Sequence, residues 1–367
     1  MTRLPVLGQR ALNRALLGRQ HLLRRAAMPA VEMIEHLVGL QAQAPLAPYV
    51  GLWSRLGGFD ADELAGLATS RQVVRASLMR NTVHLVSAPD CLAIRPLVQP
   101  VVSQGFAGHF GRAMGGVDVE AVVAAGRELL EQESRTRAQL RELLGARWPD
   151  TDADALAYAV SHLVPAAHVT PRGVWGRTGP AALTTIESWL GRPLEPRPSI
   201  DELVRRYLRA FGPATVMDVQ AWCGLTRLRE VVERVGLRAY VDAAGHDLYD
   251  VADGPLPDPE TPAPVRFLPE YDNVLLSHAD RTRVIPDGRP VPLPPGNGAS
   301  AGTVLVDGVF AATWRVRRQR RSAALTVEPF AGLSTAAHAE LVDEGGRLLS
   351  FVAPDAEAGD VRVVAAA

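Results

Sequence analysis

The sequence contains no lysine, because all 39 basic residues are arginines. Without a lysine amine, Schiff-base chemistry is excluded unless the N-terminal amine takes that role. Arginine still binds phosphate through paired hydrogen bonds, so a phosphate-bearing partner is not excluded. The net charge of −1 neither favours nor opposes such a partner, since phosphate binding depends on local patches of charge.

Cysteine is almost as rare, since the chain has only Cys91 and Cys223, far apart in apolar segments. No CxxC, HExxH or paired cysteine–histidine spacing occurs, so we expect buried reduced thiols and no metal site. The glycine patterns of dinucleotide and nucleoside triphosphate sites are absent, as is the GxSxG motif of serine hydrolases. The sequence therefore predicts no cofactor.

Long apolar runs are missing as well. No stretch of about 18 consecutive apolar residues is present to span a membrane, and the N-terminal residues lack the apolar segment of a signal peptide. With 47% hydrophobic and 22% charged residues, the composition is that of a globular protein with a sizeable core. We expect a soluble, cytoplasmic monomer without a membrane partner.

The first third of the chain has helices followed by a β-hairpin. Apolar residues before Pro45 recur with helical spacing, and Pro45 ends that helix. Residues 73–87 alternate as a hairpin with its turn at Arg80–Asn81. The order of helix, turn, helix and hairpin is typical of a winged helix, which we assign to residues 1–112.

The same order recurs twice. Residues 113–198 contain helical segments and a pair of strands around a turn at Pro171–Gly173. Residues 199–256 contain two capped helices and a hairpin with its turn at Ala243–Gly245. These segments predict a second and a third winged helix.

The last third has the pattern of a β-rich domain. A proline-rich linker at 253–264 precedes alternating segments in residues 265–355, with one helix at 334–344. The Asp307–Gly308 pair between two apolar runs predicts a tight hairpin turn. The expected fold class is therefore α+β, with three tandem winged-helix motifs followed by a C-terminal antiparallel β-rich domain.

Two glutamines, Gln41 and Gln43, flank one alanine where an apolar helix ends. In extended backbone, residues i and i+2 project to the same side, so both amides would point together and could orient a water molecule. The alternative is structural, because amides also satisfy the carbonyl groups left free at a helix end. Spacing alone favours the structural role.

The segment LPEYDNVLLSHADRTR, residues 268–283, is dense in ionisable groups. It offers a general-base carboxylate with a partner, or simply a salt-bridged strand edge. Between Arg281 and Arg321 there are eight arginines and two acids. This excess suits a phosphate-binding face, or equally a strand edge that charge protects from aggregation.

Several segments together resemble a known family, and the resemblance covers residues 5–355. These segments are LVGLQAQAPLAPYVGLWSRL, SLMRNTVHLV, LPEYDNVLLSHADR and GTVLVDGVFAATWR. They are similar to the AlkZ-like DNA glycosylases of the winged-helix family HTH_42. The resemblance implies three tandem winged helices and a C-terminal β-rich domain around a C-shaped DNA-binding channel. It also implies that Gln41 and Gln43 are the catalytic Gln-x-Gln motif, in the form linked to self-resistance against DNA-alkylating natural products.

The resemblance explains a site without an adjacent acid. An N7-alkylated purine is already cationic and leaves as a neutral base, so oriented amides need only place a water beneath C1′. We therefore expect a monofunctional glycosylase without lyase activity, acting on bulky N7-alkylpurine adducts and on interstrand cross-links in double-stranded DNA. Asp280, His278 and Asp272 are weaker candidates for accepting the water proton.

Arg281 and Arg283, on or near a basic hairpin, and Arg172 on the second wing are the expected contacts to the DNA backbone. A different class of function stays open from the sequence. The chain would then be a winged-helix regulator, or a resistance protein that binds and sequesters damaged DNA without cutting it.

Overall fold

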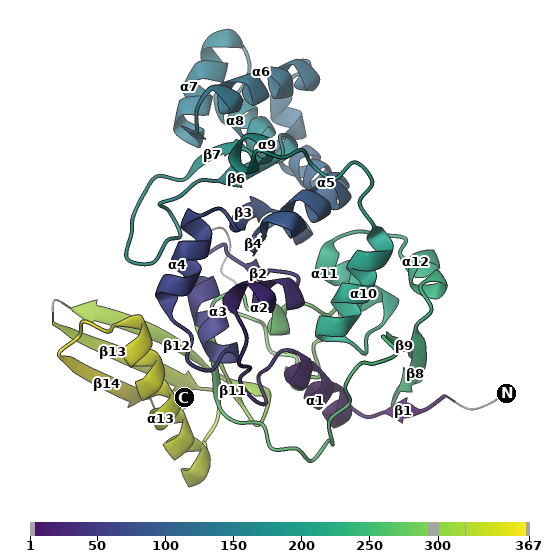
Figure 1. The fold of residues 1–367 in the computed structure, drawn as a ribbon, viewed down its shortest axis with the longest axis vertical. Helices are drawn as coiled ribbons and strands as arrows, with labels where there is room; N and C mark the ends of the chain where they lie inside the picture. Colours follow the sequence, from purple (N-terminus) through teal and green to yellow (C-terminus); the bar gives the residue numbers. More distant parts are fainter. Residues whose placement is uncertain (1–3, 293–300, 320, 365–367) are drawn as a thin grey trace.

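The computed structural model describes residues 4–292, 301–319 and 321–364. Within these residues, helices surround three β-sheets of three, five and six strands (Figure 1). The fold class is α+β, as expected. The description of Cys91 and Cys223 as buried free thiols is also confirmed. No helix in the described ranges is long and apolar enough to cross a membrane.

The first segment contains the strand with the glutamines. Its elements are α1 (Gln9–Arg19), α2 (Ala30–His36), β2 (Leu40–Gln41), α3 (Ala47–Arg55), α4 (Ala61–Thr69), β3 (Val73–Ser77) and β4 (Val83–Ser87). Helix α2 ends because Val38 and Gly39 have positive φ values of 55° and 95°. The predicted hairpin turn at Arg80–Asn81 is confirmed, since these residues have φ values of 55° and 57°.

The second segment is joined to the first through one continuous sheet. Its elements are α5 (Ala88–Phe110), α6 (Val119–Gln132), β5 (Arg135–Thr136), α7 (Arg137–Arg147), α8 (Ala153–Leu163), β6 (Ala166–His168), β7 (Ala182–Thr185) and α9 (Ile186–Leu190). Strand β3 pairs with β6, with Arg75 opposite His168, in the order β2-β4-β3-β6-β7-β5. The sequence did not predict this shared sheet, which holds the two segments together above the glutamine strand.

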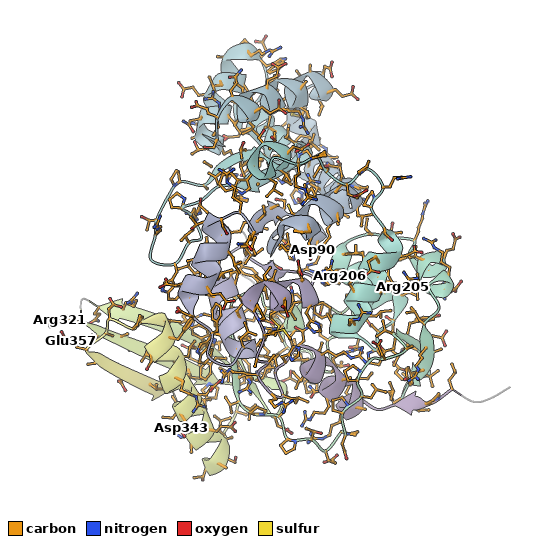
Figure 2. All side chains as sticks on the ribbon, in the orientation of Figure 1. Asp90, Arg205, Arg206, Arg321, Asp343 and Glu357 are labelled. Carbon is orange, nitrogen blue, oxygen red and sulfur yellow. The ribbon has the colours of Figure 1, made fainter. Side chains whose placement is uncertain are left out.

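The third segment consists of α10 (Ile200–Phe211), α11 (Val216–Cys223), α12 (Arg229–Arg234), β8 (Arg238–Asp242) and β9 (Asp247–Asp250). Thr215 and Asp218 form a capping box at the start of α11. The predicted hairpin is confirmed, and β1 (Val6–Leu7) adds to it by pairing in parallel with β8. Arg206 of α10 forms an ion pair with Asp90 of α5, which links this segment to the second one (Figure 2).

The C-terminal segment contains β10 (Arg266–Leu268), β11 (Gly302–Val306), β12 (Val309–Gln319), β13 (Ser322–Pro329), α13 (Thr335–Val352) and β14 (Ala358–Val363). The predicted turn at Asp307–Gly308 is confirmed by φ values of 46° and 79°. The antiparallel description needs a correction, because β14 pairs in parallel with β13. Helix α13 also runs beyond the predicted 334–344.

The linker after the third segment is fixed to the first helix. Arg14 donates a hydrogen bond to the Thr261 carbonyl at 2.7 Å, and Arg19 donates to the Pro255 carbonyl at 3.1 Å. Arg19 also forms a buried ion pair of 2.6 Å with Asp250. The proline-rich stretch is therefore packed against α1 rather than free to move as a spacer.

Candidate active site

A polar cavity of about 840 Å³ lies between the six-stranded sheet, α7, α8 and the loop after β10. Gln43 lies on its wall, next to Ala44 and Pro45. The Gln43 side-chain oxygen accepts a hydrogen bond from the Val83 backbone amide at 3.2 Å. The turn region of the first hairpin thus anchors this amide at the edge of the cavity.

Gln41 is more deeply buried, with 7% of its surface exposed. It lies opposite His84 in the β2–β4 pairing, and its Oε1 accepts a hydrogen bond from Arg80 Nη2 at 2.7 Å. Leu40 and Ala42 pack into a hydrophobic cluster, so the alternation of an extended chain puts both glutamines on the other side.

The two ionisable groups described next to Gln41 are neutral or cationic. Burial, and then the charge of the nearby Arg80, lower the pKa of His84 to about 3, so this imidazole is neutral at physiological pH. Burial likewise lowers the pKa of Arg80 to about 10, which leaves it charged. Gln41 is therefore held by a cation, with no acid in contact with it among the described residues.

Arginines form much of the cavity wall. Arg75 donates to the Ala42 carbonyl at 3.0 Å, while its Nε and Nη1 have no partner in the described part of the chain. Burial, and then Arg172, lower its pKa to about 10. Arg137 and Arg172 lie on the same cavity, and burial lowers the pKa of His168 to about 3. Arg137 and Arg172 are the exposed cations of this wall, whereas the guanidinium group of Arg75 is buried behind it.

The expected proton acceptors lie elsewhere. Asp272 forms a fully buried ion pair with Arg55 at 2.9 Å. Asp280 lines a separate cavity of about 500 Å³ beside α11 and β9, and its carboxylate accepts from the Thr282 amide at 2.9 Å. None of these acids lies on the wall that Gln43 lines, so their positions do not suit proton transfer there.

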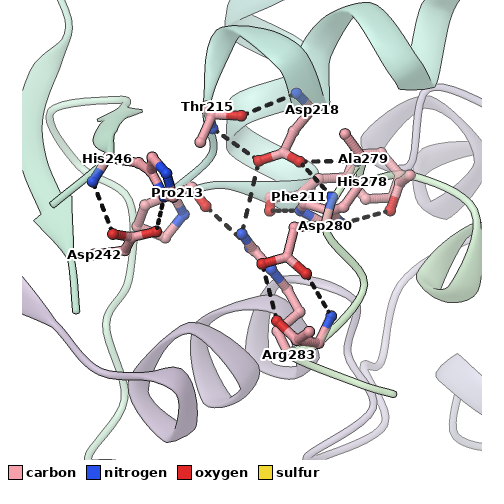
Figure 3. Close-up of polar contacts among 12 residues, drawn as sticks. Phe211, Pro213, Thr215, Asp218, Asp242, His246, His278, Ala279, Asp280 and Arg283 are labelled. Atoms are coloured by element: carbon pink, nitrogen blue, oxygen red, sulfur yellow. Dashed lines mark hydrogen bonds and ion pairs between the residues drawn. The ribbon is translucent and has the colours of Figure 1, made fainter. Parts of the chain in front are cut away.

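His278 is part of a buried network below α11 (Figure 3). Its Nε2 lies 3.1 Å from the Phe211 carbonyl, and burial lowers its pKa to about 3. The Asp218 carboxylate accepts from the Ala279 amide at 2.9 Å in the same network. These contacts fix the loop after β10 onto the third segment, which is a structural task.

Two of the three expected DNA contacts are exposed. Arg172 is exposed at the edge of the large cavity, and Arg281 is exposed in the loop after β10. The expectation for Arg283 needs a correction, because this side chain is 6% exposed and donates to the Pro213 carbonyl at 3.0 Å (Figure 3). This burial argues against a phosphate contact by Arg283.

The basic hairpin is formed by β12 and β13 rather than by the loop with Arg281. Its arginines pair with acids: Arg315 with Glu328 at 3.2 Å, and Arg321 with Glu357 near the outer end of the sheet (Figure 2). These pairs are exposed and weak, so the guanidinium groups can exchange partners.

Sequence reasoning missed three residues on the cavity wall. Glu270 lies beside Gln43's neighbours Ala44 and Pro45, and Arg75 and Arg137 come from two different segments. Glu270 belongs to the segment 268–283, which is dense in ionisable groups. Only the fold shows that Glu270 lines the cavity while Asp272, two residues later, is buried. Among the described residues, no cluster of histidine, cysteine, aspartate and glutamate could hold a metal ion.

Comparisons with known proteins identify the family of this chain. A family model described as DNA glycosylase AlkZ-like matches residues 34–351. The chain therefore belongs to the AlkZ-like DNA glycosylase family, as its sequence segments indicated.

Its structure is similar to that of the Streptomyces sahachiroi DNA glycosylase AlkZ, with a TM-score of 0.77. The match covers 98% of this chain and 100% of that chain at 19% sequence identity, so it shows the shared fold. A comparison with curated proteins gave no match.

Proposed function

We propose that this protein is a monofunctional DNA glycosylase that hydrolyses the N-glycosidic bond of N7-alkylated purines in double-stranded DNA. The family assignment supports DNA glycosylase activity. The observation that carries the proposal further is the position of the glutamines. Gln43 lies on a cavity with three arginines in its wall, and the buried Gln41, two residues earlier, accepts a hydrogen bond from Arg80. In this proposal both amides position the attacking water.

The proposed chemistry needs no acid to protonate the departing base. Alkylation at N7 makes the purine cationic, so the C1′–N9 bond breaks to release a neutral base. Water adds to C1′ from the opposite side, and the products are the free base and an abasic site. Arg137 and Arg172, both exposed, would hold the phosphates that flank the damaged nucleotide. Since the chain has no lysine, no side-chain amine is available for a subsequent strand cleavage.

A second cavity supports a bulky adduct as the substrate. It has a volume of about 560 Å³ and is lined by apolar side chains that include Leu46, Trp175 and Trp314. Ala44, Pro45 and Glu270 line both cavities, so the two spaces adjoin at the glutamine strand. An adduct on the purine would extend from the polar cavity into the apolar one. In this proposal the substrates are adducts and cross-links made by a genotoxic natural product. The enzyme then serves self-resistance.

The arrangement of segments around the cavities fits the proposed substrate. The repeated order of helices and hairpin corresponds to three winged helices, and a C-shaped channel between them would take the duplex. The alternative, a regulator or a sequestering protein without enzymatic activity, would use the same channel for DNA binding alone.

The test is excision from duplex DNA that contains N7-methylguanine, followed by alkali to cut at abasic sites. The expected result is release of the modified base by the wild type, with much slower release by Gln41→Ala and Gln43→Ala. Both variants should still bind DNA with an abasic-site analogue. DNA binding without any base release would support the non-enzymatic alternative instead.

A further inference from the structure

Glu270 is the one acid on the wall of the cavity that Gln43 lines, within the described part of the chain. It is half-buried, and it also borders the apolar cavity beside Trp175 and Trp314. The other wall residues that ionise are cationic or weakly acidic, namely Arg75, Arg137, Arg172, His162, His168, Tyr158 and Tyr271. Within the described residues, no ion pair joins the Glu270 carboxylate to any of these side chains. Its hydrogen-bond partner is the backbone amide of Glu270 itself.

The residues on either side of Glu270 are held by two contacts, one to the turn before the glutamine strand and one to β12. Asn273 donates to the Gly39 carbonyl at 2.9 Å, two residues before Gln41. Trp314 donates to the Leu268 carbonyl at 2.9 Å, two residues before Glu270. The loop that presents Glu270 is therefore attached to the same short stretch of backbone that presents the glutamines.

The conformation of this loop is unusual. Tyr271 has a φ of 63°, in the left-handed region that large side chains rarely adopt. The next residue, Asp272, is held by the buried ion pair with Arg55. Strain of this kind persists when the surrounding contacts enforce it, and it is frequent at functional sites. Here it turns the chain so that Asp272 enters the core while Glu270 stays at the cavity.

We propose that Glu270 is the general base of the reaction. This rests on the proposed function. As water adds to C1′, a new C1′–O bond forms while the C1′–N9 bond breaks, and its electron pair stays with the departing neutral base. The proton of the water passes to the Glu270 carboxylate. Gln41 and Gln43 orient the water, and Glu270 supplies the proton acceptor that the Gln-x-Gln motif lacks.

The ionisable groups around Glu270 decide whether its protonation can be seen in the pH profile of excision. Burial raises the pKa of Glu270 above its usual range. Burial also lowers the pKa values of His162 and His168, and the other charged side chains on the two cavities are Arg75, Arg137, Arg172, Arg315 and Arg318. Excision should therefore slow as the pH falls through the raised pKa of Glu270, where the base becomes protonated.

The experiment measures single-turnover release of N7-methylguanine from duplex DNA between about pH 5 and about pH 9. Glu270→Gln should lower the rate about 100-fold at neutral pH, a typical loss for a general base. Its residual rate should no longer depend on pH in the acid range. The matched control is Glu195→Gln, an exposed glutamate away from both cavities, which should behave as the wild type.

Binding to DNA with an abasic-site analogue is measured in parallel, and Glu270→Gln should bind as well as the wild type. A Glu270→Gln variant with the wild-type rate would overturn the proposal, as would a slow variant that keeps the wild-type acid limb. If the wild type itself releases no modified base, the proposed function fails first, and the two failures are thereby distinguished.

Discussion

Arg80 Nη2 donates a hydrogen bond of 2.7 Å to Gln41 Oε1, across the turn of the first hairpin. Arg80 has a φ of 55°, and its Nη1 donates to the Trp222 carbonyl at the end of α11. A guanidinium group has donors only, so the oxygen of the Gln41 amide must face it. The amide nitrogen is therefore the part of Gln41 that faces away from Arg80 and can donate to a water molecule.

Replacement of Arg80 by alanine should slow excision more than it weakens DNA binding. The loss of one charge-assisted hydrogen bond, worth about 1.5–3 kcal/mol, corresponds to about a 10- to 100-fold lower rate. Arg80→Lys keeps the charge but loses the planar fork that reaches Gln41 and Trp222 from two nitrogens, so its rate should lie between those of the wild type and Arg80→Ala. Single-turnover rates and affinities for abasic-analogue DNA decide this, and equal losses in both would make Arg80 a DNA contact instead.

Asp272 should matter for stability rather than for catalysis. Asp272→Asn leaves the buried Arg55 without its counterion, at a cost of about 3–5 kcal/mol in the free energy of unfolding. Asp250→Asn is the matched control, since Asp250 forms a similar buried ion pair with Arg19 away from the cavity. Urea unfolding should show comparable losses in both variants.

Folded Asp250→Asn should excise the damaged base at the wild-type rate, whereas folded Asp272→Asn should lose activity only as far as the loop that presents Glu270 shifts. An Asp272→Asn protein with normal stability and no activity would contradict the structural role and return Asp272 to the list of proton acceptors.

Local chemistry made several turns predictable. The Arg80–Asn81 and Asp307–Gly308 turns follow from residues that tolerate positive φ between alternating strands, and both are present. Two uncharged amides that interrupt an apolar segment made the Gln-x-Gln pair noticeable, while the catalytic hypothesis for it came from the family resemblance over residues 5–355. Each of these features depends on a few consecutive residues, which is why the sequence contains enough information.

Contacts between distant segments were not predictable in this way. Glu270, Asp272 and Arg283 all come from one dense segment, yet one lines the cavity and two are buried in ion pairs or networks. Their environments depend on Arg55, Asp218 and the third segment, far away in the sequence. The pairing of β3 with β6 is also long-range, because hairpin patterns specify a register within a hairpin but not between hairpins.

Glu270 should lower the stability of the protein at neutral pH. Its pKa is raised by burial, so the folded state holds a proton more tightly than the unfolded state. Proton binding by Glu270 therefore stabilises the folded state at low pH, and this stabilisation is lost as the pH rises through the raised pKa. Glu270→Gln should therefore be at least as stable as the wild type at neutral pH, with the difference shrinking in acid. Thermal unfolding midpoints at several pH values measure this, and a marked loss of stability would mean that Glu270 supports the fold.

Arg172 and Arg137 should each contribute one phosphate contact. Such a contact adds about 0.9 to the slope of log affinity against log salt concentration, so Arg172→Ala and Arg137→Ala should each reduce the slope by about one. Arg229→Ala is the control, because Arg229 is exposed on α12 and pairs with Glu233 at 3.5 Å. Affinities for undamaged duplex DNA at several salt concentrations give the slopes. The same reduction in all three variants would place the duplex over α12 as well, and unchanged slopes for Arg172→Ala and Arg137→Ala would remove the cavity wall from the DNA path.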